Sequence, residues 1–241
     1  MQIREADSIE DLDEITRVQR EVWNIDDVEI VGRLQLRAAQ HAGGSVLVAI
    51  AEDGSIGGFA YALPAHVDGE TFWHSDMLAV RPLFRGTGMG QQLKWTQRER
   101  ALKSGVTRIT WTFDPMQAGN ANLNLELLGA TAREYLENFY GVTTSTLHHG
   151  LPTDRLLASW DLEGPRVVAL ARGEAGPGAA IAERVLVPRS WNDLVKNNVE
   201  AARAEQRRVA GALKAAFAKG LAATGFEKTS ASYLLSRPEG P

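Results

Sequence analysis

The chain contains no cysteine at all among its 241 residues. Without thiols it can form no disulfide, no thiolate zinc site and no cysteine-linked covalent intermediate. Absence of cysteine is typical of proteins kept in a reducing compartment, and we expect this protein to be cytoplasmic.

An excess of basic residues is also missing, because 26 Lys and Arg face 30 Asp and Glu, for a net charge of −4. This balance favours neither nucleic acid nor an anionic membrane surface as the main partner. The longest apolar runs, such as Val46 to Ala51, are far shorter than a membrane span. The acidic start of the sequence also lacks the basic-then-apolar layout of a signal peptide. We therefore expect a soluble protein without a membrane partner.

What is present is ordinary for a globular protein, with 44% hydrophobic and 23% charged residues. A chain of this length can bury a sizeable core as one large domain, or as one domain with a smaller appendage. The turn-forming stretch Glu163-Gly164-Pro165 punctuates the sequence. We predict a main domain over residues 1–161 and a C-terminal extension over residues 162–241.

Apolar periodicity predicts the elements of the main domain. A Ser8–Asp11 capping pattern begins a helix at 9–22, and a second helix is expected at 28–41. The Asp53-Gly54 pair between two apolar runs predicts a hairpin. The other elements expected are strands 45–51, 56–63, 71–80, 106–113, 131–135 and 156–161, and helices from the glycine stretch to about 104 and at 120–128. Hairpins mixed with helical crossovers indicate an α/β (α+β) fold, a mixed central sheet flanked by helices.

Beyond residue 166 the pattern predicts a strand at 185–188, one long helix after Ser190 and a closing strand at 226–235. The helix carries an apolar stripe between residues 195 and 216. That stripe could cover the main sheet or form the seam of a homodimer, and the sequence leaves both arrangements open.

The most informative stretch is Arg85-Gly86-Thr87-Gly88-Met89-Gly90, which follows the apolar segment 77–80 and precedes a helix. A strand, a glycine turn and a helix in this order can hold an anion on backbone N–H groups at the helix N-terminus. A Walker A loop is excluded, because Gln91-Gln92 stands where Lys-Ser/Thr is required. A Rossmann fingerprint fits poorly, since its third glycine would fall on Gln91. A tight surface turn is the remaining alternative.

This R-x-x-G-x-G stretch resembles the pyrophosphate loop of the GNAT family of N-acyltransferases, which bind coenzyme A there. The resemblance spans roughly residues 1–161 in element order and is strongest at 77–90. It implies acetyl-CoA or another acyl-CoA as co-substrate and no metal. The cofactor-binding residues that it implies are Leu78, Ala79 and Val80 at the thioester, Arg85, Gly86, Thr87, Gly88, Met89 and Gly90 at the pyrophosphate, and Asn120 and Asn124 at the pantetheine amides. A helix cap is the competing explanation for Asn120.

Three further stretches, 111–115, 138–141 and 150–155, resemble a predicted acyltransferase subfamily. Some relatives in that group look like N-succinyltransferases that work beside an N-succinylamino-acid racemase. The resemblance implies an amino acid or an analogue as the amine acceptor, and it leaves acetyl and succinyl donors open.

His74 and Asp76 are the candidate catalytic residues on the strand before the glycine stretch, and residues two apart on a strand share a face. Family members with a base there use histidine or carboxylate, so the resemblance implies a base or a water-mediated relay. Close relatives carry His-x-His, and Asp76 departs from that pattern, so the identity of the base stays open. The alternative is that both residues solvate a strand end. The family's acid, a helix tyrosine, is replaced by Leu125, which leaves Tyr140 as the nearest substitute or as a packed loop aromatic.

His148-His149 could suggest a metal, but adjacent histidines do not easily chelate one ion and no carboxylate completes a site. We expect His149 to line the acceptor pocket and Arg155 to bind an acceptor carboxylate, with a surface ion pair as the alternative for Arg155.

The sequence therefore predicts an N-acyltransferase that moves an acetyl, succinyl or other short acyl group from acyl-CoA to a small-molecule amine. Direct attack in a ternary complex is favoured, since the chain has neither a cysteine nor a G-x-S-x-G elbow to carry the acyl group. The alternatives are a catalytically idle CoA sensor, a protein N-acetyltransferase, and a scaffold that has lost CoA binding.

Overall fold

The computed structural model describes residues 1–141 and 150–237. These residues form two compact units, unit 1 with residues 1–111 and unit 2 with residues 112–141 and 150–237. The boundary lies inside β5 (Arg108–Phe113), after Trp111. The predicted domain boundary after residue 161 stays a prediction.

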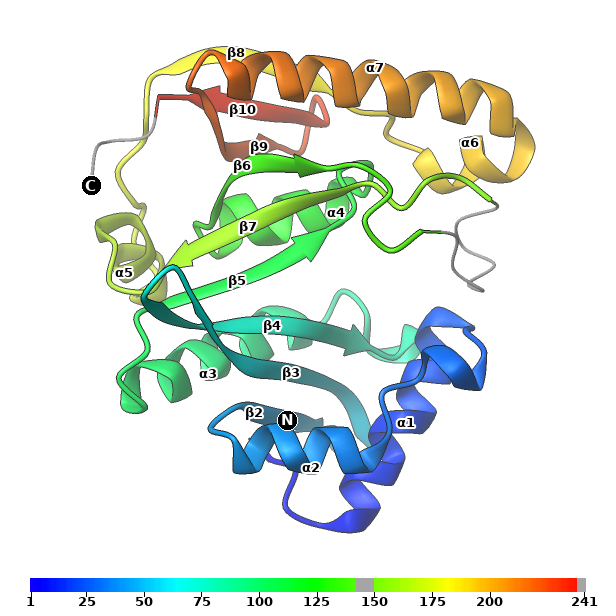
Figure 1. Cartoon of the computed structure of the whole chain (residues 1–241), viewed down its shortest axis with the longest axis vertical. Coiled ribbons are helices and arrows are strands. Elements are labelled where there is room, and N and C mark those ends of the chain that lie inside the picture. Colours follow the sequence, from blue (N-terminus) through cyan, green and yellow to red (C-terminus); the bar gives the residue numbers. More distant parts are fainter. Residues whose placement is uncertain (142–149, 238–241) are drawn as a thin grey trace. The chain divides into compact units, whose positions relative to one another are not determined.

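Unit 1 contains a mixed sheet in the order β1-β2-β3-β4-β5 (Figure 1). Its strands before β5 form an antiparallel meander, and β5 joins β4 in parallel. The elements are β1 (Gln2–Glu5), α1 (Ile9–Trp23), α2 (Arg33–His41), β2 (Ser45–Ile50), β3 (Ile56–Val67), β4 (Glu70–Val80), α3 (Met89–Lys103) and the 3-10 turns Asp27–Glu29 and Pro82–Phe84.

Local chemistry explains where these elements begin and turn. Ser8 and Asp11 form the predicted capping box of α1. At the β2–β3 turn, Asp53 accepts a hydrogen bond from the Ser55 amide at 2.9 Å and Gly54 adopts φ +82°. The β3–β4 turn has positive φ at both Asp68 and Gly69, as a two-residue hairpin requires. The hairpin predicted at Asp53-Gly54 is confirmed.

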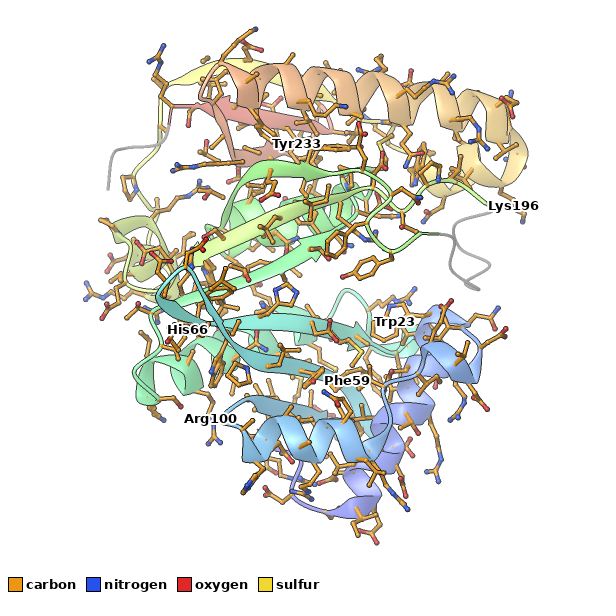
Figure 2. The ribbon with its side chains drawn as sticks, viewed as in Figure 1. Trp23, Phe59, His66, Arg100, Lys196 and Tyr233 are labelled. Atoms are coloured by element: carbon orange, nitrogen blue, oxygen red, sulfur yellow. The ribbon has the colours of Figure 1, made fainter. Side chains whose placement is uncertain are left out.

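Helices cover both faces of the unit 1 sheet. Buried residues of α1 and α2 pack with Phe59 and Tyr61 on one face, where the rings of Trp23 and Phe59 meet edge to face at 6.1 Å (Figure 2). The alternate residues, Leu47 and Ala60 among them, face Met89 and Leu93 of α3. The predicted α/β class, a mixed sheet flanked by helices, is confirmed.

Unit 2 contains antiparallel strands in the order β7-β6-β9-β10-β8. The long helix α7 packs on β6 and β8 and completely buries four residues of the predicted apolar stripe, Ala202, Val209, Leu213 and Ala216. The stripe therefore covers strands of its own chain. The elements are α4 (Ala118–Ala121), a π-helix (Asn122–Leu127), β6 (Thr131–Leu136), β7 (Arg155–Asp161), α5 (Pro165–Ala171), β8 (Ile181–Leu186), α6 (Trp191–Asn197), α7 (Val199–Ala218), β9 (Ala222–Glu227) and β10 (Ser232–Ser236).

The predicted helix over residues 28–41 is wrong in its first half. The side chain of buried Gln19 makes two hydrogen bonds to the backbone of Val31. It donates to the Val31 carbonyl at 3.0 Å and accepts from the Val31 amide at 2.9 Å. This side-chain clamp occupies the backbone groups that a helix would need, so α2 begins only at Arg33.

Two C-terminal predictions also need correction. The predicted single helix after Ser190 is two helices, because Asn198 takes a non-helical conformation and its side chain caps α7 by accepting from the Ala201 amide. The predicted single strand at 226–235 is the β9–β10 hairpin, whose turn includes Ala231 at φ +53°. The predicted turn at Glu163-Gly164-Pro165 is present and leads into helix α5, where proline takes a favoured first position.

Within the described parts of the chain, no helix has both the length and the apolar character that crossing a bilayer requires.

Candidate functional site

The glycine stretch of unit 1 forms an exposed elbow between β4 and α3. Gly86 and Gly88 have φ of +79° and +84°, a region that glycine enters without a steric cost. Gly88 is the N-cap of α3, and the first helical bond runs from the Gln92 amide to the Gly88 carbonyl at 3.0 Å. Among the described residues no side chain caps this end, and no acidic residue lies in the first turn. The elbow therefore presents helix N-terminal N–H groups to an anion.

Both ends of the elbow pack closely on the sheet because Gly57 has no side chain. A Cβ there would lie 2.7 Å from Met89 Cε and 2.8 Å from Phe84 Cδ2. Glycine thus lets Phe84, before the elbow, and Met89, after it, pack closely on β3. Met89 is buried, so only its backbone is available to a ligand at the loop.

The elbow also contacts the end of β4 directly. Thr87 Oγ1 donates to the Phe84 carbonyl at 2.8 Å, and Arg85 Nε donates to the Val80 carbonyl at 3.4 Å. A Cβ on Gly90 would stand 3.6 Å from Val80 Cγ2 and 3.9 Å from Leu78 Cδ2. The structure therefore brings the predicted pyrophosphate residues next to the predicted thioester strand.

One edge of β4 has an unpaired segment. In the described chain, β4 pairs with β5 only at Trp73–Ile109 and His74–Thr110, whereas its pairing with β3 continues to Val80. Leu78, Ala79 and Val80 lie beyond the last β5 pair. Their backbone groups on that side are suited to hydrogen-bond an amide-bearing ligand.

A β-bulge interrupts β4 between the elbow and His74, the last residue of β4 that pairs with β5. Tyr61 pairs with Met77 and Leu63 pairs with His74, so Ser75 and Asp76 together oppose the single residue between Tyr61 and Leu63. Bulges re-aim side chains and are frequent beside active sites. The sequence analysis did not predict this bulge, because it depends on the partner strand's register.

His74 lies in a half-buried position on β4. Its Nδ1 lies 3.0 Å from Oγ1 of Thr110 on β5. Burial lowers the pKa of His74 below its ordinary value of 6.5, the carboxylate of Asp76 opposes this shift, and the charge of Lys94 adds to it. In the tautomer with the proton on Nδ1, His74 donates to Thr110 and Nε2 carries the lone pair that a general base needs.

Asp76 keeps an exposed surface beside His74. Desolvation by the surrounding protein raises the pKa of its carboxyl group, and the nearby His74 partly offsets this rise. Each group thus shifts the pKa of the other, which places the two predicted catalytic residues within electrostatic reach.

A buried polar cluster missed by the sequence analysis lies on the α3 side of the bulge. Lys94 Nζ donates to Ser75 Oγ at 3.0 Å and to Gln97 Oε1 at 2.7 Å, and it lies 3.9 Å from the centroid of the Trp111 ring. Lys94 is 2% exposed and Gln97 is fully buried. The sequence could have indicated this cluster, because Lys94 and Gln97 share a stripe of α3 with Leu93 and Ala101. Polar residues on a buried stripe are unusual.

In unit 2, the predicted pantetheine residues lie on an irregular helical segment. Asn120 is exposed at the end of α4, and Asn124 is buried within the π-helix. They are not one α-helical turn apart, as a regular helix over 120–128 would place them. The cap explanation for Asn120 is wrong, because Gln117 is the N-cap of α4. Leu125 is completely buried.

Tyr140 and Arg155 lie together in unit 2. The Tyr140 hydroxyl is 2.9 Å from Thr112 Oγ1, and the Arg155 guanidinium lies 5.2 Å from the centroid of the Tyr140 ring. In the described part of the chain, no carboxylate lies within ion-pair distance of Arg155, and Asp154 instead accepts from Tyr135 and from the Asn138 amide. The predicted residue His149 lies outside the described residues.

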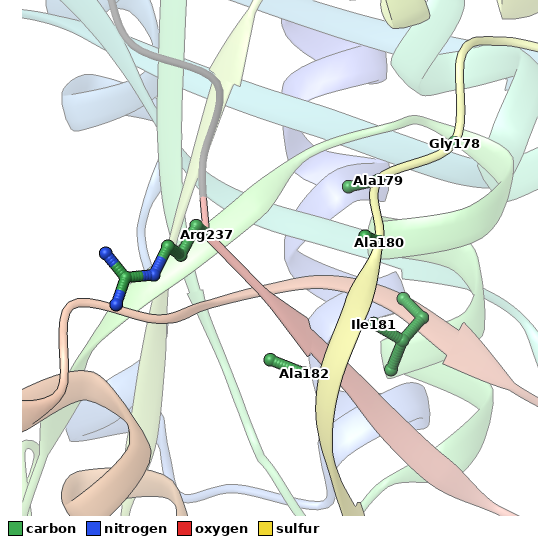
Figure 3. A pocket seen from close by; sticks show the side chains of 6 residues that line it. All are labelled: Gly178, Ala179, Ala180, Ile181, Ala182 and Arg237. Carbon is green, nitrogen blue, oxygen red and sulfur yellow. The ribbon is translucent and has the colours of Figure 1, made fainter.

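Two surface hollows of unit 2 contain none of the predicted site residues. One of about 370 Å³ is lined by Gly178, Ala179, Ala180, Ile181, Ala182 and Arg237 (Figure 3). The other, of about 320 Å³, lies beside Gln117 and Trp191. Neither brings together a base, a nucleophile or an anion-binding loop, so the elbow and the β4 bulge remain the candidate site.

Comparison with known proteins gives one family match. The model of the acetyltransferase (GNAT) family matches residues 9–129, which include the elbow, the bulge and the π-helix. No curated protein matches the chain.

Several solved structures share the fold at low sequence identity. Aminoglycoside 6'-acetyltransferase type Ii is 18% identical, with 68% of this chain and 99% of that chain covered and a TM-score of 0.54. The protein yncA from Salmonella typhimurium, solved with its cofactor acetyl-CoA, is 22% identical, with 75% and 99% covered and a TM-score of 0.54. The ribosomal-protein-S18-alanine N-acetyltransferase from Escherichia coli is 15% identical, with 68% and 94% covered and a TM-score of 0.53.

Proposed function

The chain belongs to the acetyltransferase (GNAT) family, and from this premise we propose that it transfers an acetyl or other short acyl group from acyl-CoA to the amine of a small molecule. The observation that carries the proposal is the uncapped, glycine-lined N-terminus of α3, at which Gly86 and Gly88 keep side chains away from the approaching ligand. A pyrophosphate suits this elbow because its charge complements the helix dipole without a metal.

The rest of the cofactor would continue along β4. The pantetheine arm carries two amides, and the unpaired edge at Leu78, Ala79 and Val80 offers backbone partners for them. On the family resemblance alone we also assign Asn120 and Asn124 to this arm. Buried Asn124 would bind through an amide already held in place, since a buried polar group needs a partner.

His74 would act as the general base. It removes a proton from the acceptor amine, whose nitrogen then bonds to the thioester carbonyl carbon while the C–S bond breaks. A neutral imidazole held by Thr110 has the protonation state and orientation for this step. Asp76 would position the amine through charge or assist His74. No group of the protein carries the acyl chain, so both substrates bind together.

For the acceptor, we propose an amino acid or an analogue, as the subfamily resemblance implies. Arg155 stacks on Tyr140 and is not paired with a carboxylate in the described chain, so its guanidinium can bind an acceptor carboxylate in two-point fashion. His149 is assigned to the acceptor pocket on the sequence alone. Relatives of the same fold are named for a small-molecule acceptor and for a protein acceptor, so a protein N-acetyltransferase is the alternative acceptor class.

A CoA-binding sensor without turnover is the second candidate function. Its support is Leu125, which stands completely buried at the position of the family's acid tyrosine. This function predicts that CoA binds and that no acceptor is acylated.

The decisive experiment is a thermal melt of the protein with acetyl-CoA, succinyl-CoA, free CoA and NADH at equal, saturating concentration. A ligand at 100 times its dissociation constant adds about 2.7 kcal/mol, a shift of several degrees. We expect the CoA species to raise the midpoint and NADH to leave it unchanged. The thioester with the largest shift then enters a screen of amines, in which product formation separates the enzyme from the sensor. Equal midpoints with all four ligands would reject CoA binding.

A further inference from the structure

Lys94 lies at the point where β4 and β5 separate. The last ladder pair is His74 with Thr110, and Lys94 contacts the next residue on each strand, Ser75 and Trp111. Its side chain comes from α3, the helix whose N-terminus forms the elbow. One helix therefore supplies both the anion-binding end and a basic group at the inner end of the unpaired edge of β4.

The neighbouring Gln97 has a buried donor that the described chain does not satisfy. Its Oε1 accepts from Lys94, while its Nε2 is buried and has no hydrogen-bond partner among the described residues. An unpaired buried donor costs about 1 to 3 kcal/mol. Such a buried donor shows that the polar cluster beside the amine of Lys94 has incomplete hydrogen bonding.

If CoA binds as in the proposed function, its pantetheine arm is long enough to place the sulfur beside Lys94. From Val80, next to the elbow, to Ser75 is five residues of strand. The pantetheine arm is about as long as five extended residues. An arm that starts at the elbow and follows the unpaired edge of β4 therefore ends at the bulge, beside Ser75 and Lys94.

We propose that Lys94 stabilises the thiolate that leaves when acyl-CoA is cleaved and returns it to the thiol. As the acceptor nitrogen bonds to the carbonyl carbon, the C–S electron pair moves to sulfur, and the ammonium hydrogen-bonds this sulfur and gives it a proton. His74 takes the proton of the amine, and Lys94 regains a proton after the products have left. Lys94 thus acts as the general acid in place of the family's tyrosine, whose position is occupied by Leu125.

The surroundings of Lys94 suit this role. Its buried position strengthens its attraction to a developing negative charge. Burial also lowers the pKa of Lys94 well below the ordinary 10.5, which brings proton release by its ammonium closer to neutral pH.

The test is the acidity of the thiol of bound CoA, followed by the ultraviolet absorbance of the thiolate as pH is raised. In the wild-type complex we expect the thiol pKa to lie about 1 to 3 units below that of free CoA, as for an acid beside an opposite charge. Lys94→Met should return it close to the free value. The matched control is Lys103→Met, which removes an exposed lysine from the last turn of the same helix.

The outcomes separate this inference from the proposed function. If CoA produces no thermal shift, the proposed function fails before the thiol is measured. If CoA binds and the wild-type complex leaves the thiol pKa at its free value, the role of Lys94 is rejected even if Lys94→Met does not fold. A thiol pKa lowered equally in the wild type and in Lys94→Met also rejects it, and assigns the effect to the helix dipole. With an acceptor in hand, Lys94→Met should reduce kcat with little change in KM for acyl-CoA.

Discussion

His74 and Thr110 join β4 to β5 through a 3.0 Å contact between Nδ1 and Oγ1, at the last residue pair before the strands separate. The contact fixes the imidazole ring at the inner end of the unpaired edge. Because Nδ1 is occupied by Thr110, Nε2 is the nitrogen that can act on an acceptor.

The acidic limb of the pH profile of kcat/KM should therefore lie at a pH below 6.5, the ordinary pKa of histidine, since burial lowers the pKa of His74. A base works in its neutral form, so a lowered pKa extends activity toward acid. His74→Gln should lose about 10²- to 10⁴-fold in rate. Thr110→Val keeps the base and should lose less. An acidic limb above pH 6.5, or full activity in His74→Gln, would contradict the assignment.

Asp76→Asn should move the acidic limb further toward low pH. The carboxylate of Asp76 attracts the imidazolium and raises the pKa of His74, so its removal lowers that pKa. An NMR titration can follow His74 directly, with His74→Gln identifying its signal among the five histidines. An unchanged titration would show that the two residues are not coupled.

Gly88→Glu should abolish the thermal shift produced by CoA. It places a carboxylate where the pyrophosphate would bind, at a residue with φ +84°. The matched control is Gly54→Glu in the β2–β3 turn, where φ is +82° and a Cβ would have open space. Both variants should lose about 1 to 2 kcal/mol of stability from the left-handed backbone. Only Gly54→Glu should still respond to CoA, and a response in both would reject the elbow as the CoA loop.

Two tyrosines of unit 2 should respond differently to loss of their hydroxyl groups. Fully buried Tyr233 donates to the Pro115 carbonyl at 2.8 Å, so Tyr233→Phe leaves that carbonyl unsatisfied and should cost about 1 to 3 kcal/mol. The Tyr140 hydroxyl is in an exposed side chain, so Tyr140→Phe should change stability by less than about 0.5 kcal/mol. Thermal melts measure both effects. If Tyr140→Phe reduces kcat while stability stays unchanged, Tyr140 rather than Lys94 is the acid.

Much of the fold followed from local patterns in the sequence. The capping box at Ser8 and the Asp53-Gly54 turn depend on residues a few positions apart, and both were predicted correctly. The wrong predictions occurred where a distant partner or a helix cap determined the backbone conformation. Gln19 holds Val31 outside the helix predicted there, and Asn198 divides the long C-terminal helix by capping its second part.

The sequence by itself determined that a strand, a glycine elbow and a helix follow one another at residues 77–90, because glycine at positive φ and an uncapped helix start are properties of adjacent residues. Only the tertiary structure decided what meets at the inner end of β4. The bulge at Ser75 and Asp76 depends on the register of β3, and the partners of His74 and Lys94 come from β5 and α3. Such contacts join residues that are distant in the sequence, since Lys94 and Ser75 are 19 positions apart and His74 and Thr110 are 36. No local periodicity records them, because they form only when separate elements pack together.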